Sequence, residues 1–76
     1  MKIFVAIGTY NTSQTFVDCA FSKREDAEQY VAALNSDKEK GVARCKEQIA
    51  LQEGDAMVAF LDEKGIRYEV VETELK

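Results

Sequence analysis

The sequence predicts an α+β fold, in which a small antiparallel sheet (a β-hairpin plus a C-terminal strand) carries two or three helices on one face. Three observations support this prediction: strand-like alternation over residues 2–10 and 15–21, helical spacing from residue 23 onward, and a further alternating stretch at the C-terminus. Seventy-six residues suit one domain, so we expect a single unit over 1–76 with the element order ββααβ or ββαααβ.

The first expected strand covers residues 2–10. Its apolar side chains fall on both faces, with Ile3, Val5 and Ile7 on one and Phe4 and Ala6 on the other. This pattern is typical of a central strand, or of a strand whose second face is also covered.

A second strand is expected over residues 15–21. The polar connection before it contains Asn11, which tolerates a left-handed backbone, so the two strands are predicted to form a hairpin. Alternation in the second strand places Val17, Cys19 and Phe21 on one face and Phe16, Asp18 and Ala20 on the other.

A capping signal predicts that a helix over residues 23–34 follows. Ser22 can accept a hydrogen bond from the backbone N–H of Glu25, and the Glu25 carboxylate can reach back to the N–H of Ser22. One apolar helix face follows, formed by Ala27, Tyr30, Val31 and Leu34. Lys23 and Arg24 fall in the first turn, where the helix dipole favours acids. They are either tolerated surface charges or contacts to an acidic partner.

Residues 37–53 fit two patterns. Val42, Cys45 and Ile49 fall on a helical stripe, whereas Ala43, Cys45, Glu47, Ile49 and Leu51 alternate as in a strand. We favour the helix because the charge-rich segment 44–48 makes a poor interior strand. Gly54 is the expected end of this helix.

Residues 55–64 are also open to two interpretations. As a helix, they begin with Asp55 as N-cap and present the apolar residues Met57, Phe60 and Leu61. As a strand, they lead through a turn at 62–65 into the next strand. The composition favours the helix.

The last expected strand covers residues 66–75. Tyr68 and Val70 share one face, and Val71, Thr73 and Leu75 share the other. Glu69, Glu72 and Glu74 are typical of charges that keep an exposed strand from pairing edge to edge.

Composition excludes several functional classes. The chain has no His and only two Cys, so we expect no zinc site, no Cys–His nucleophile, no cofactor and no enzyme. Cys19 and Cys45 are interpreted as reduced packing residues of a cytoplasmic protein rather than a disulfide, because no secretory signal pattern opens the chain. No apolar run approaches the ~20 residues of a membrane span. The net charge of −4 disfavours direct nucleic-acid binding.

The candidate interaction surface is the sheet face opposite the helices. We expect Phe4, Ala6 and Phe16 to lie there, beside Val71 if the register permits, because helices cover only one face of a three-stranded sheet. The alternative is that residues 37–64 cover this patch. Tyr10 in the connection, Lys23 and Arg24 complete the candidates, although Tyr10 also suits half-buried packing.

Two stretches resemble small uncharacterised bacterial and phage proteins, which have a β-hairpin, a helix entered through Phe-Ser-x-x-Glu-x-Ala-Glu, and a final strand with alternating Glu. The matching stretches are Phe21-Ser22-Lys23-Arg24-Glu25-Asp26-Ala27-Glu28 and Tyr68-Glu69-Val70-Val71-Glu72-Thr73-Glu74-Leu75. Residues 37–64 depart from that pattern because they are longer. The resemblance implies an accessory protein that acts by binding, and it carries over no catalytic residue.

The leading hypothesis is a non-enzymatic protein-interaction module, of phage type, that binds and modulates or inhibits a host or defence protein. The alternative is a homodimeric domain that binds a small ligand between subunits or under the helices. A carboxylate-based enzyme and an acidic nucleic-acid mimic rank below both, since −4 is a thin charge for imitating a phosphate backbone. The expected partner is a protein, either a host protein or a second copy in a homodimer.

Overall fold

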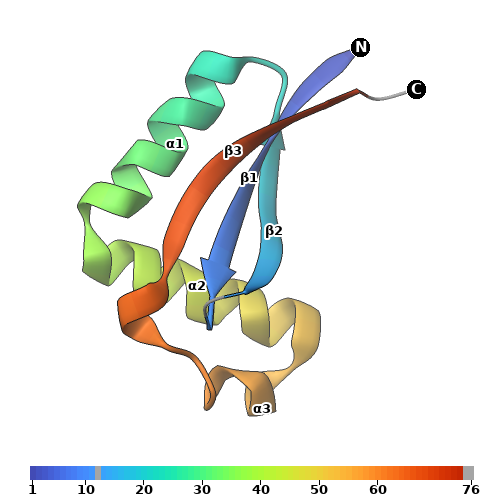
Figure 1. The fold of residues 1–76 in the computed structure, drawn as a ribbon. Coiled ribbons are helices and arrows are strands. Elements are labelled where there is room, and N and C mark those ends of the chain that lie inside the picture. Colours follow the sequence, from blue (N-terminus) through green and yellow to red (C-terminus); the bar gives the residue numbers. More distant parts are fainter. Residues whose placement is uncertain (12, 75–76) are drawn as a thin grey trace.

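The computed structural model describes residues 1–11 and 13–74. Its elements are β1 (Lys2–Tyr10), β2 (Gln14–Phe21), α1 (Arg24–Ser36), α2 (Lys38–Glu53), α3 (Asp55–Val58), the 3-10 helix η1 (Glu63–Gly65) and β3 (Arg67–Glu74). The strands form one sheet in the order β2-β1-β3, with both outer strands antiparallel to β1 (Figure 1). The predicted α+β fold is confirmed, with β1 in the centre and the order ββαααβ.

The helices pack on one face of the sheet, where α1 runs beside β3 and α2 crosses near the far ends of the strands (Figure 1). The core lies between these layers and consists of Ala6, Tyr10, Phe16, Val31, Leu34, Cys45, Ile49 and Tyr68. No helix in the described part of the chain is both long and apolar enough to cross a membrane.

The helices cover the face of β1 that was predicted to be open. Ala6 is 0% exposed and Phe16 is 5% exposed, so both belong to the core. The reason lies at Gly8, where a Cβ atom would come within 2.4 Å of the Phe16 ring and 3.0 Å of the Tyr68 ring. The missing side chain leaves room for these two rings on the helix side. They pack edge to face there, with centroids 6.0 Å apart.

A β-bulge in β2 changes which residues share a face. Ala6 pairs with Cys19, but the next pair is Ile7 with Val17, so Asp18 is an extra residue. Phe16 therefore faces the helices together with Cys19, while Val17 faces away. The predicted grouping of Val17 with Cys19 and Phe21 is wrong for this reason. The predicted hairpin is present, and Asn11 has a positive φ of 49° in its turn.

The start of α1 differs from the predicted capping box. Lys23 is the N-cap residue, and no side chain caps the helix there. The carbonyl of Lys23 accepts the bond from the N–H of Ala27, at 3.3 Å, so the helix begins one residue after the position that Ser22 would require as a cap. The predicted apolar face of this helix is confirmed, with Ala27, Val31 and Leu34 buried.

The helical interpretation of residues 37–53 is confirmed by α2. The Asp37 side chain caps this helix by accepting from the N–H of Lys40 at 3.2 Å. Gly54, with φ of 94°, ends it as predicted. At its start, a Cβ on Gly41 would lie 2.6 Å from the carbonyl oxygen of Leu34, so glycine permits the close approach of α1 and α2.

The helical interpretation of residues 55–64 holds for one turn only. α3 ends at Val58, and its N-cap is Gly54 rather than Asp55. Phe60, predicted to lie on an apolar helix face, is 71% exposed because the chain has left the helix before reaching it.

β3 has the predicted arrangement of side chains. Tyr68 is buried on the helix face, and its hydroxyl donates to the carbonyl of Gly41 at 2.6 Å. Val71 and Thr73 lie on the opposite face, level with Val5 and Ile3 of β1. The predicted position of Leu75 lies outside the described residues.

Candidate functional site

The sheet has a second face, which we call the open face, and the described helices do not pack on its apolar part. Its members come from all three strands: Ile3, Val5, Ile7 and Thr9 of β1; Thr15, Val17 and Ala20 of β2; and Arg67, Glu69, Val71 and Thr73 of β3. Thr9, at the end of this face, is buried. Residues paired across strands share a face, so the register alone fixes this membership.

The apolar side chains of the open face are contiguous. Val5 lies between Ala20 and Val71, and the next row places Ile7 beside Val17. Val17 is 54% exposed and Val71 is 41% exposed, both high for branched apolar side chains. Strand spacing and rise give this patch a width of about 14 Å and a length of about 17 Å. Apolar patches of a few hundred Å² on small proteins mark contact surfaces.

The open face carries little charge. Its charged members are Arg67 and Glu69, which lie two residues apart on the outer strand β3 and have opposite signs. The whole chain carries a net charge of −4. The open face is therefore neutral on a protein that is acidic overall.

Both edges of the sheet disfavour pairing with the same strand of a second copy. On β2, the bulge at Asp18 interrupts the regular backbone, and the Gln52 amide donates to the outward carbonyl of Val17 at 2.7 Å. On β3, Glu69, Glu72 and Glu74 outnumber Arg67, so pairing of this strand with its own copy would bring like charges close together. The open face is thus better suited to self-association than either edge.

Three of the predicted interface residues lie in the core. Ala6, Tyr10 and Phe16 are at most 5% exposed and cannot reach a partner while the protein is folded. Tyr10 does not stand out from the hairpin connection, because its ring packs against Phe16 and its hydroxyl donates to Glu53 of α2 at 2.7 Å. The predicted contact role is therefore wrong for these three residues.

The other predicted candidates occupy the surface. Val71 is the one that lies on the open face. Phe4 is half-buried on the helix side, and the guanidinium of Arg24 lies over its ring at 5.3 Å from the centroid. Arg24 also pairs with Glu72 at 3.6 Å, so an acidic group of its own chain already contacts it. Lys23 is exposed.

A buried polar cluster was not predicted from the sequence. The side chain of Asp18 is 0% exposed and accepts from Arg44 Nε at 2.9 Å and from the Tyr30 hydroxyl at 2.8 Å. The cluster joins β2 to both long helices. Hydrogen bonding to Asp18 raises the pKa of Arg44, and burial with the Asp18 contact raises the pKa of Tyr30. Because these groups bond to one another, the cluster is structural.

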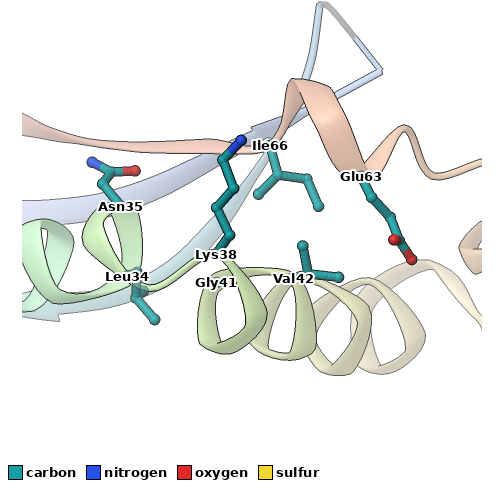
Figure 2. Close-up of a pocket in the computed structure, with 7 residues that line it drawn as sticks. All are labelled: Leu34, Asn35, Lys38, Gly41, Val42, Glu63 and Ile66. Atoms are coloured by element: carbon teal, nitrogen blue, oxygen red, sulfur yellow. The ribbon is translucent and has the colours of Figure 1, made fainter.

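A small hollow lies between the end of α1, the start of α2 and the segment before β3 (Figure 2). It is lined by Leu34, Asn35, Lys38, Gly41, Val42, Glu63 and Ile66. Its volume is about 40 Å³, which holds a few water molecules, whereas ligand sites measure hundreds of Å³. The amide of Asn35 is already bonded to the backbone of Tyr68. The hollow therefore does not support the small-ligand alternative.

The cysteines have the character of packing residues. Both are free thiols, and Cys45 is 0% exposed. Burial raises the pKa of Cys45 to about 11 and also raises the pKa of Cys19. Both shifts favour the protonated thiol, which is the less nucleophilic form.

The three tyrosines predict a loss of stability at alkaline pH. The hydrogen bond to Glu53, with burial, raises the pKa of Tyr10 to about 12, and burial raises the pKa of Tyr30 and Tyr68 as well. The folded state therefore favours the neutral phenols. Their contribution to the free energy of unfolding is complete below the unfolded pKa of 10.0 and falls as pH rises toward 12. Urea unfolding across this range, with tyrosinate absorbance followed in parallel, measures the effect. Tyrosines that titrate near 10 in the folded protein would contradict it.

Within residues 1–11 and 13–74, no group of three or more Cys, Asp or Glu side chains could hold a metal ion. Comparisons with protein-family models, with curated proteins and with solved structures find no match to this chain. Its function is therefore inferred from the placement and chemistry of its own side chains.

Proposed function

We propose that this protein is a non-enzymatic protein-interaction module that contacts a second copy of itself through the open face of its sheet. The observation that supports this most is the contiguous apolar patch of Ile3, Val5, Ile7, Val17, Ala20 and Val71 on a face that the described helices do not cover. Burial of such a patch against another apolar surface is favourable in proportion to the area removed from water.

Charge and shape support a second copy as the occupant. Two chains of net charge −4 repel each other over most of their surfaces, but not where the neutral open faces meet. Branched side chains such as Val5, Ile7 and Val71 form a flat layer, and two such layers pack face to face ~10 Å apart in β-sandwiches. The contact would also add buried apolar area to a domain with a small core.

The size of the patch sets the expected strength of the dimer. A footprint of a few hundred Å² on each copy lies below the standard interface of ~800 Å² per partner. We therefore expect a dimer in exchange with its monomer at micromolar concentrations. A partner protein with an apolar surface would compete with the second copy for the same residues. The sequence resemblance to phage proteins supports a host or defence protein, modulated or inhibited by binding, as that competitor.

Sedimentation velocity over a range of concentrations tests the proposal. We expect the wild-type protein to shift from monomer toward dimer, and the V71K variant to remain a monomer because its ammonium would be buried in the contact. L51K is the matched control, since Leu51 is 75% exposed on α2 and also changes from apolar to cationic. It should dimerise like the wild type. A wild-type monomer at every concentration, or equal dimerisation of V71K and L51K, would exclude the open face as the contact.

A further inference from the structure

A side-chain contact at the outer edge of β3 shows which backbone groups of this strand point away from the sheet. The N–H of Tyr68 donates to the side-chain oxygen of Asn35 at 2.9 Å, and the Asn35 amide donates back to the carbonyl of Tyr68 at 2.9 Å. Asn35 lies on α1, so both backbone groups of Tyr68 are directed outward, away from β1. The amide of Asn35 thereby makes the two bonds that a neighbouring strand would make at this residue.

The same direction applies to every second residue along β3. Its antiparallel pairing with β1 runs from Arg67 to Glu74 without irregularity, and backbone groups alternate between inward and outward. The N–H and C=O of Val70, Glu72 and Glu74 therefore also point outward. Among the described residues, no side chain bonds to them as Asn35 does to Tyr68. At three alternate residues of β3, the outer edge of the strand is thus open to pairing.

The side chains around this edge carry more carboxylates than cations. Glu69, Glu72 and Glu74 are on the strand, and Glu28 lies on the same side of α1 as Asn35, two helical turns away. Three cations offset part of this charge: Arg67 on the strand itself, and Arg24 and Lys2, which both contact Glu72 at 3.6 Å. The edge therefore repels the acidic β3 of a second copy and favours a basic segment.

We propose that the β3 edge binds an extended basic segment of another protein as a fourth strand. The backbone of Val70 and Glu72 would form the ladder, which is the general mode of β-strand addition. Basic side chains of the segment would alternate toward α1 and Glu28, and apolar ones would extend the open face beside Val71. This contact does not depend on dimerisation through the open face, so each proposal can fail without the other.

Amide hydrogen exchange by NMR tests this proposal with a synthetic peptide in which lysine and valine alternate. In wild-type protein, the peptide should slow exchange at the N–H groups of Val70 and Glu72 but not at Val71, whose N–H already bonds to β1. A peptide with glutamate in place of lysine should leave all three unchanged. Unchanged exchange at Val70 and Glu72 with the lysine peptide, or equal slowing by the glutamate peptide, would overturn the proposal.

Two variants of Glu72 distinguish the contribution of its backbone N–H to peptide binding from that of its carboxylate. E72P and E72A both remove the carboxylate, but only proline also removes the outward N–H, and proline is tolerated in an edge strand at such a position. We expect E72P to bind the lysine peptide roughly tenfold more weakly than E72A, because the peptide carbonyl loses its donor. Circular dichroism confirms that both variants fold. Equal affinity of the two folded variants would show that the backbone does not pair and would overturn the proposal.

Discussion

Replacing Phe16 with serine is expected to unfold most of the protein. The Phe16 ring is 5% exposed and packs between Tyr10 and Tyr68 over Gly8, so serine leaves a cavity and places a hydroxyl in an apolar site. The cost of deleting a buried Phe side chain is about 4 kcal/mol. That is comparable to the whole stability of a domain this small. Urea unfolding followed by circular dichroism measures the loss.

The neighbouring residue provides the control. Val17 lies on the open face and is 54% exposed, so V17S should change the free energy of unfolding by less than about 0.5 kcal/mol. It should instead weaken dimerisation, because its side chain belongs to the proposed contact. If V17S unfolded the protein and F16S did not, the helices would cover the other face of the sheet.

Removing the carboxylate of Asp18 is expected to have the second large effect. D18A would leave the Arg44 guanidinium and the Tyr30 hydroxyl without their shared acceptor beneath the helices. Breaking a buried ion pair on one side costs 3–5 kcal/mol in general, and we expect about 3 kcal/mol here because the Arg44 side chain is 31% exposed. The midpoint of urea unfolding at neutral pH should fall accordingly.

A second partner of Arg44 serves as the comparison. Glu47 lies 3.4 Å from the guanidinium, but its side chain is 61% exposed. E47A should therefore cost less than about 0.5 kcal/mol, as exposed ion pairs do. If D18A and E47A lowered stability by the same small amount, the buried cluster would contribute little to the fold.

The order and type of the elements could be predicted from the sequence, because each has its own periodicity. The stripe of Ala27, Val31 and Leu34 identified α1, and the stripe of Cys45 and Ile49 identified α2. The end of α2 was also predictable, since Gly54 adopts a backbone that favours glycine. The bounds of α3 were not, because the apolar residues that suggested a longer helix include the exposed Phe60.

The covered face of the sheet could not be predicted from alternation alone. β1 is apolar on both faces, so its pattern does not say which one the helices cover. The deciding features were the absence of a side chain at Gly8 and the bulge at Asp18. Asp18, an acid within the apolar stretch 16–21, was a signal for that bulge, since a buried carboxylate needs a partner such as Arg44. The predicted interface residues Ala6 and Phe16 were misplaced for the same reason.

Contact between open faces is tested most directly by isotope-filtered NOE spectroscopy on a mixture of labelled and unlabelled protein. Only pairs of protons on different copies give a signal in this experiment. We expect intermolecular NOEs among the methyl groups of Ile3, Val5, Ile7 and Val71. Their absence at concentrations where sedimentation shows a dimer, or NOEs confined to Leu51 and Phe60, would contradict the open face as the contact surface.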